Sequence, residues 1–225
     1  MISDILGSAS AADPNERADA ARSLSEKCGY AAAALTILPI PLSEVVAVVP
    51  LHVGMVVGIG NIYGAEVSRE SAQELLLKIG TTVGLSLVGT KLATSAAKMI
   101  LPFLGGLLAA PFMYASTIAI GTIARMYYER SGELSEAEMK ALYKEAFTRA
   151  KTSFDPAKAK ANEAKDLASK AASEAEKTAP AEVAAEPEVT EDPVARLERL
   201  KSLLDKGLID QGEYDEVKKR ILEGI

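Results

Sequence analysis

Few residues in this sequence are of the types that catalyse reactions. His52 is the only histidine and Cys28 the only cysteine. One histidine cannot supply a metal-binding His pair, and one cysteine excludes an internal disulfide and a cysteine-based zinc site. Because His52 lies between Leu51 and Val53, we expect it to be a packed or hydrogen-bonded helix residue. The sequence therefore predicts no catalytic residue, no metal, no cofactor and no enzyme.

Two other features resemble functional sites and do not meet their requirements. Glu44 is the only acidic residue between Cys28 and residue 65, so no second carboxylate lies near it in the sequence for acid–base chemistry. Its expected place is near the N-terminus of a helix, where the helix dipole favours it. Residues 84–91 resemble a phosphate loop, but Thr90 separates Gly89 from Lys91, and the surrounding pattern is helical. Nucleotide binding is not expected.

Lys91, Thr94, Ser95 and Lys98 recur at the spacing of one helix face within an otherwise apolar stretch. The two lysines are candidate contacts for anionic lipid headgroups or for an acidic partner, and they would line water if the chain formed a pore. The alternative is that this stripe is the solvent-facing side of its helix.

Glycines are frequent in the apolar part of the chain, and three pairs have the Gly-xxx-Gly spacing. This spacing puts two positions without side chains one turn apart, which lets helix backbones approach closely in apolar surroundings. A tightly packed soluble bundle would use the same glycines. The candidate helix-packing residues are Gly54, Gly58, Gly60, Gly64, Gly80, Gly84 and Gly121.

Composition favours an all-α protein. Apolar residues make up 48% of the 225 residues, aromatic residues only 5%, and tryptophan is absent, so the apolar content is mostly Ala, Val, Leu and Ile. The formal charge of −6 argues against nucleic acid as a partner, because phosphate binding requires clustered Lys and Arg. The first 27 residues mix acidic and basic side chains and lack the apolar segment of a secretory signal, so we expect a cytosolic amino terminus.

A tail, residues 1–12, precedes the first predicted helix, which Asp13 caps and which runs to about Lys27. Shorter helices should flank residues 39–41, the second of them running from Ser43 or Glu44 to about residue 63. A further helix from about residue 70 to 101 should end in a turn at Pro102 and residues 105–106, followed by a helix from residue 107 or 111 to 128.

Residues 45–65 and 99–124 are uncharged and about long enough to cross a bilayer, which takes roughly 20 residues. We therefore expect residues 35–128 to insert as packed hairpins, with both termini cytosolic.

Behind the apolar part, Ser135 and Glu138 form a predicted capping box for an amphipathic helix, which completes an apolar helical domain at residues 13–154. Residues 155–191 are rich in Ala, Glu, Lys and Pro and read as a linker, in which residues 157–177 form a solvated helix and the remainder is disordered.

Residues 192–225 predict a helical hairpin. Asp192 caps its first helix, Gly207 ends it, and Asp210 with Glu213 caps the second. About 34 residues cannot bury a sufficient core alone, so the hairpin should dock or self-associate. Its predicted interaction residues are Leu197, Leu200, Leu204, Tyr214, Val217 and Ile221.

Two known families share these features. Residues 13–150 resemble the bacterial YcjF-like family of unknown function numbered 697, a GTPase-associated domain, through the Pro-Ile-Pro at 39–41 and the segments at 58–64, 101–105 and 117–121. Residues 192–225 resemble the short C-terminal domain known as SHOCT, through the Leu-rich run, Gly207, Ile209, Tyr214 and Lys218. The first resemblance implies a helical, membrane-associated protein that serves a separate GTPase. The second implies oligomerisation or tethering.

Together these features predict a non-enzymatic, membrane-associated scaffold or adaptor on the cytoplasmic side of the inner membrane. It would anchor through its Gly-rich helices and recruit a partner or oligomerise through its hairpin. The alternative is a soluble, cytoplasmic helical adaptor that regulates a GTPase or a stress-response complex.

Overall fold

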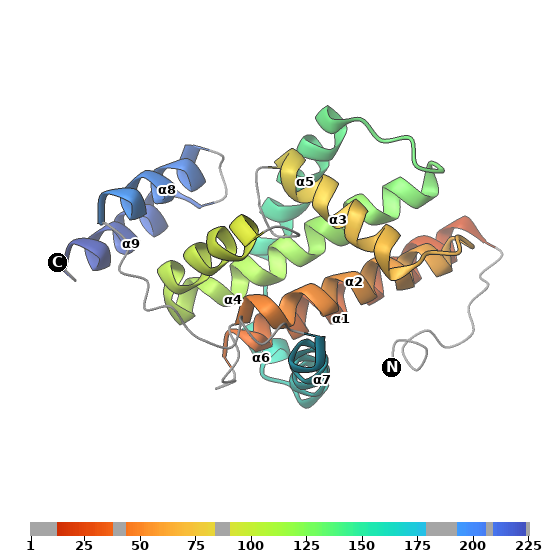
Figure 1. Ribbon diagram of the computed structural model, residues 1–225, viewed down its shortest axis with the longest axis horizontal. Coiled ribbons are helices and arrows are strands. Elements are labelled where there is room, and N and C mark those ends of the chain that lie inside the picture. Colours follow the sequence, from red (N-terminus) through yellow and green to blue (C-terminus); the bar gives the residue numbers. More distant parts are fainter. Residues whose placement is uncertain (1–12, 38–43, 84–90, 179–192, 206–208, 224–225) are drawn as a thin grey trace.

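The computed structural model describes residues 13–37, 44–83, 91–178, 193–205 and 209–223, and within these ranges every regular element is a helix (Figure 1). The predicted all-α fold is therefore confirmed. The helices are α1 (Pro14–Leu35), α2 (Glu44–Ile62), α3 (Arg69–Val83), α4 (Lys91–Glu129), α5 (Glu136–Thr152), α6 (Pro156–Ala159), α7 (Asn162–Thr178), α8 (Pro193–Asp205) and α9 (Gln211–Glu223).

The first helix is longer than its sequence suggests. Asp13 caps α1 as predicted, accepting a hydrogen bond of 2.9 Å from the backbone N–H of Asn15. The expected end near Lys27 is wrong, because α1 continues to Leu35. Every residue of α1 from Cys28 to Leu35 is buried. A helix that is apolar all round must be enclosed by other helices, and α1 contacts α2, α4, α6 and α7.

Helix α4 is the other central element, and it corrects a second prediction. Pro102 and residues 105–106 were expected to form a turn, but α4 is helical from Lys91 to Glu129. Glycine and proline disfavour a helix interior by only about 1 and 3 kcal/mol, so tertiary packing overrides them here. α4 contacts α1, α2, α3, α5, α6 and α9.

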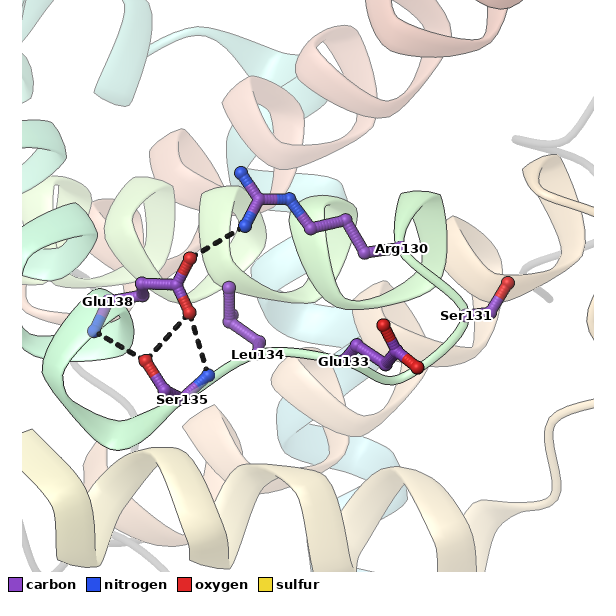
Figure 2. Close-up of a pocket in the computed structure, with 6 residues that line it drawn as sticks. All are labelled: Arg130, Ser131, Glu133, Leu134, Ser135 and Glu138. Carbon is purple, nitrogen blue, oxygen red and sulfur yellow. Dashed lines mark hydrogen bonds and ion pairs between the residues drawn. The ribbon is translucent and has the colours of Figure 1, made fainter.

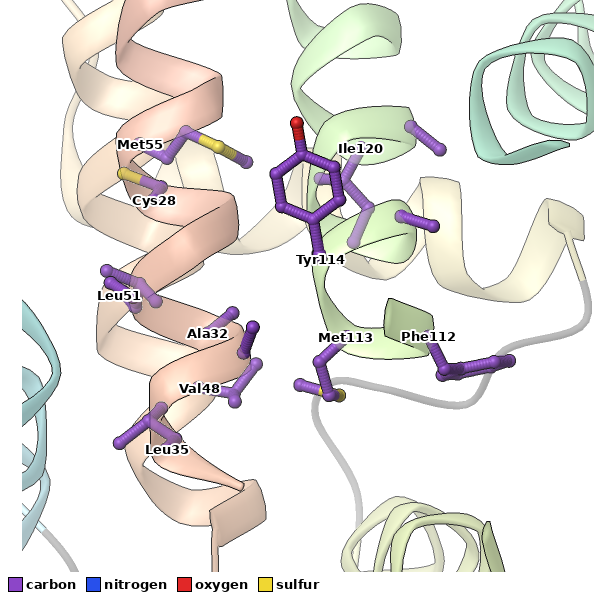
Figure 3. Packing of buried hydrophobic residues seen from close by; sticks show 14 of the residues in the cluster. Cys28, Ala32, Leu35, Val48, Leu51, Met55, Phe112, Met113, Tyr114 and Ile120 are labelled. Carbon is purple, nitrogen blue, oxygen red and sulfur yellow. The ribbon is translucent and has the colours of Figure 1, made fainter. Parts of the chain in front are cut away.

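The core lies where α1, α2 and α4 meet, as Figure 3 shows. Leu35 from α1, Met55 from α2 and Ile120 from α4 are each at most 2% exposed. The rings of Tyr30 and Tyr114 pack in a tilted arrangement with centroids 4.5 Å apart and join α1 to α4. None of the described helices combines the length and the apolarity needed to cross a bilayer.

The predicted linker is wrong over its first half. α7 is not a solvated helix, because one of its faces packs on α1 and α2. A short α6 precedes it, with Asp155 as its N-cap and Ala159 fully buried. Among the side chains of α7 that the structure describes, the buried ones are all alanines, namely Ala164, Ala168, Ala171, Ala172 and Ala175. The rest of the predicted linker, residues 179–192, lies outside the described residues.

Candidate interaction surfaces

The predicted packing glycines have different environments. Gly54, Gly58, Gly60 and Gly80 are buried on α2 and α3, whereas Gly84 lies outside the described residues. Gly64 is not a packing residue, because it is exposed beyond the end of α2 and has a φ of +76°. This left-handed conformation favours glycine, so Gly64 terminates the helix.

Gly121 provides the close helix approach that was expected of the glycines. A Cβ at this position would lie 2.8 Å from Cβ of Ser25 and 3.4 Å from Sδ of Met55, and still closer to Oγ of Ser25. Ser25 is buried on α1 and donates a 2.8 Å hydrogen bond to the carbonyl oxygen of Ala21. The absence of a side chain at Gly121 therefore sets the spacing between α1 and α4.

The two candidate lysines lie in the first two turns of α4, which begins at Lys91 and includes Lys98. Their side chains are outside what the structure describes. Their predicted contact with lipid or an acidic partner stays a prediction.

The hairpin is formed and docked. Leu200, Val217 and Ile221 are at most 5% exposed, whereas Leu197, Leu204 and Tyr214 are half-buried against the core. α8 packs on α9, and α9 also contacts α4. All six predicted interaction residues therefore contribute to the packing of the hairpin.

One carboxylate both caps the hairpin's second helix and ties it to the body. Glu213 accepts a 2.9 Å hydrogen bond from the backbone N–H of Asp210, and its own N–H donates to the Asp210 carboxylate at 2.9 Å, which is the predicted capping box. The same Glu213 side chain pairs with Lys151 near the end of α5, and both side chains are at most 20% exposed. No sequence pattern predicts this contact, because the two residues lie far apart in the chain.

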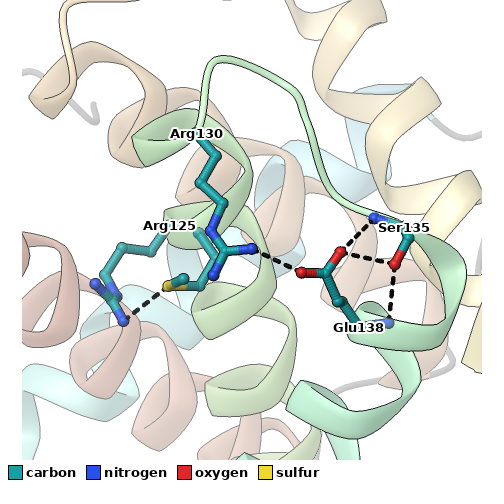
Figure 4. A network of polar contacts seen from close by, with 5 residues as sticks. Arg125, Arg130, Ser135 and Glu138 are labelled. Carbon is teal, nitrogen blue, oxygen red and sulfur yellow. Dashed lines mark hydrogen bonds and ion pairs between the residues drawn. The ribbon is translucent and has the colours of Figure 1, made fainter.

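A shallow concavity of about 770 Å³ lies at the connection between α4 and α5, lined by Arg130, Leu134, Ser135 and Glu138 among others (Figure 2). Ser135 and Glu138 form the predicted capping box, and Nη1 of Arg130 donates to Glu138 at 2.7 Å (Figure 4). Hydrogen bonds from Ser135, assisted by Arg130, lower the pKa of Glu138 to about 2. The Glu138 carboxylate stays ionised and hydrogen-bonded, so its role here is to hold the start of α5 in place.

The two chemically versatile residues lie inside the core. Burial raises the pKa of the Cys28 thiol to about 12, so it is protonated at neutral pH. Burial lowers the pKa of His52 to about 4, so its ring is neutral. His52 Nε2 lies 2.9 Å from Oγ1 of Thr117, which gives its own proton to the carbonyl oxygen of Met113, so the ring nitrogen is the donor. The expectation of a packed, hydrogen-bonded histidine is correct. No cluster of metal-ligating side chains exists in the described part of the chain.

The sequence did not predict how α7 is held. Lys27 of α1 pairs with Glu163 of α7 at 3.4 Å, and Arg69 of α3 pairs with Glu174 of α7. Lys158 of α6 pairs with Glu26 of α1 at 3.0 Å. The alanines of α7 recur every three or four residues, and this period was the available signal that one side of the helix is buried.

Comparison with known proteins places these surfaces in a family. The family model described as a domain of unknown function, DUF697, matches residues 7–152, and the SHOCT (short C-terminal domain) model matches residues 195–222. A curated relative, magnetosome membrane protein 22 of Magnetospirillum gryphiswaldense, is 33% identical over 129 residues. That alignment covers 54% of this chain and 65% of the relative. No solved structure matches the chain. Since the first family model spans well over half of the sequence, the chain belongs to the DUF697 family and carries a SHOCT domain behind it.

Proposed function

We propose that this protein is a non-enzymatic scaffold or adaptor that associates with a membrane through its apolar, Gly-rich helical body and contacts its partner through the C-terminal hairpin. The similarity to a magnetosome membrane protein carries the membrane part of this proposal. Membrane association does not require a spanning helix, since apolar helices also bind at the bilayer surface.

The chemistry of the buried residues supports a non-enzymatic role. The Cys28 thiol is protonated and the His52 ring is neutral, and both lie in the core, where a substrate could reach them only if the helices separated. A nucleophile or general base must instead be accessible and have a pKa suited to the operating pH. The scaffold therefore acts through its surfaces.

The placement of the hairpin supports the proposal that it contacts a partner. It is joined to the body through the ion pair between Lys151 and Glu213 and through α9 on α4, so a partner or a second copy would compete for the same face. Leu200 is 3% exposed and belongs to α8, which packs on α9, so it supports this face from inside the hairpin. A separate GTPase as the partner stays a prediction.

Fractionation of the full chain tests the proposal. We expect the protein to sediment with membranes, to resist a high-salt wash and to be released in part by alkaline carbonate, as a surface-bound protein is. Recovery of all the protein in the supernatant before any wash would instead support the soluble adaptor.

The hairpin's role is tested in the same preparation. Leu200→Asp puts a charge into the hairpin core, whereas Lys201→Asp reverses the charge of an exposed neighbour. We expect only Leu200→Asp to abolish co-purification of partners or of a differently tagged copy. Equal co-purification by the two variants would contradict recruitment through the hairpin.

A further inference from the structure

Helix α7 covers part of α1 and α2 through a weakly stabilising contact surface. Its fully buried side chains are alanines, each of which buries one methyl group where leucine would bury a whole isobutyl group. One larger side chain of α7, Leu167, also packs against the core, although it is only partly buried. Apolar stabilisation scales with the area removed from water, so a helix whose buried side chains are alanines is held less firmly per turn than α1 and α2, which bury whole leucine side chains.

The surface under α7 is strongly apolar. α7 packs on both α1 and α2, and α1 is buried without interruption from Cys28 to Leu35. In Figure 3 the side chain of Leu51, on α2, points away from α4, and this side chain is 5% exposed. Removal of α7 would expose apolar surface of α1 and α2 together.

Two of the ion pairs in the described part of the chain attach α7 to α1 and α3, and both have the same polarity. The cations, Lys27 and Arg69, belong to the body, and the carboxylates, Glu163 and Glu174, belong to α7. The carboxylates are about 16 Å apart along the helix at 1.5 Å per residue, so they brace α7 near both of its ends. Both cations and Glu163 are between 46% and 74% exposed, so salt weakens these attachments.

The α6 pair, Lys158 with Glu26, has the opposite polarity and lies beside the aromatic group formed by Tyr30, Tyr114 and Phe154. Lys158 Nζ also lies 5.4 Å from the centroid of the Tyr30 ring. This cation–π contact adds to the ion pair and fastens α6 to α1. A displacement of α7 would therefore leave α6 attached to α1, which makes α6 the hinge.

We propose that α7 is a displaceable cover, and that the α1–α2 face beneath it, flanked by Lys27 and Arg69, is the surface that contacts an anionic bilayer. This inference rests on the membrane association proposed above. In the closed form, with α7 in place, Glu163 and Glu174 pair with the two cations. In the open form, with α7 displaced, lipid phosphates pair with the same cations. An apolar floor between two cations matches a bilayer of anionic headgroups over acyl chains.

Two double variants break the same two ion pairs of α7, and the proposal predicts stronger binding to anionic vesicles for the first variant than for the second. Glu163→Gln with Glu174→Gln loosens α7 and leaves the cations, whereas Lys27→Gln with Arg69→Gln loosens α7 and removes them. Because each basic residue near an anionic surface adds about fivefold in affinity, binding should differ by about 30-fold between the two. The assay is flotation with vesicles of phosphatidylglycerol and phosphatidylcholine, against vesicles of phosphatidylcholine alone.

Control variants reproduce both charge changes at exposed pairs that lie within single helices. Asp19→Asn with Glu145→Gln and Arg22→Gln with Arg149→Gln disrupt the pairs of α1 and α5. If these controls differ in vesicle binding as much as the α7 variants do, net charge explains the effect and the proposal is overturned.

Hydrogen exchange on the wild-type chain tests displacement without any variant. Amides of α7 should exchange faster than those of α1 and α2, and faster still in about 1 M salt, where charges are screened beyond about 3 Å. Exchange of α7 as slow as that of α2 under both conditions would show that α7 is a fixed part of the core.

A second variant changes neither ion pair. Ala168→Asp places a carboxylate at a position with no exposed surface, whereas Ser169→Asp makes the same charge change on the exposed side. Ala168→Asp should free α7 and raise binding to phosphatidylglycerol vesicles in spite of its added negative charge. If α7 is released without a gain in vesicle binding, the α1–α2 face is not a membrane surface. If the released chain dimerises in the absence of lipid, the face instead contacts another copy of the chain.

These outcomes are separable from failure of the proposed function. Wild-type protein that fractionates with cell membranes, while the Glu163 and Glu174 variant gains no vesicle binding, refutes only the cover. Absence of all membrane binding by the wild type and by every variant refutes both proposals.

Discussion

Replacing Gly121 by alanine should destabilise the protein, although alanine is the better helix former. The new Cβ would lie 2.8 Å from Cβ of Ser25, a separation that packed side chains do not tolerate, so α1 and α4 must move apart. Overpacking a core costs about 1–3 kcal/mol, and the helix propensity of alanine returns about 1 kcal/mol. We expect a net loss of about 1 kcal/mol in the free energy of unfolding.

Ser25→Gly should rescue this loss. On its own the change removes the hydrogen bond from Ser25 to the carbonyl oxygen of Ala21 and leaves a small void, so it is destabilising. Combined with Gly121→Ala, it transfers the missing side chain from α4 to α1, and the new methyl group occupies the vacated space. The two effects should therefore be non-additive by about 1–2 kcal/mol in the stabilising direction.

Urea unfolding followed by far-UV circular dichroism measures the stability of the wild type, the two single variants and the double variant. Their unfolding free energies can be compared directly if the four m-values are equal. In thermal melts each kcal/mol corresponds to about 2–4 °C for a chain of this size. A neutral or stabilising Gly121→Ala, or effects that add within about 0.5 kcal/mol, would refute the role of Gly121 in setting the spacing of α1 and α4.

Three other predictions follow from single contacts. The pKa of His52 is about 4 in the folded chain and about 6.5 in the unfolded chain, so the unfolded chain binds more protons as the pH falls from 6.5 to 4, which destabilises the fold. His52→Gln should abolish roughly 3 kcal/mol of this destabilisation, measured as the difference between the unfolding free energies at pH 7 and at pH 4. Ser135→Ala removes the hydroxyl donor and keeps the backbone donor, so it should raise the pKa of Glu138 from about 2 part of the way towards 4.5 in an NMR titration of its carboxyl carbon. An unchanged pKa would exclude the Ser135 hydroxyl as its cause. Lys151→Ala should speed hydrogen exchange in α8 and α9 and leave α1 and α2 unchanged, whereas the exposed Lys144→Ala should alter neither.

Local sequence determined the helix starts. Asp13, Ser135 and Asp210 all cap helices as predicted, because a cap depends only on a side chain and the backbone N–H groups two or three residues later. The burial of His52 was likewise predictable from its apolar neighbours, and that of Val217 and Ile221 from their spacing along one helix face. Sequence also indicated the family and its C-terminal domain, which the family models confirm.

Tertiary structure decided where helices continue and which surfaces they cover. α1 runs past Lys27 and α4 runs through Pro102 because contacts with other helices outweigh local preferences of about 1–3 kcal/mol. α7 has the composition of a solvated linker, yet it is buried along its alanines. Alanine suits both states equally well, and only the presence of a complementary apolar surface on α1 and α2, far away in the sequence, selects the packed one. The pairs that attach α7 and the hairpin to the body depend on the same long-range placement, so no local pattern could have predicted them.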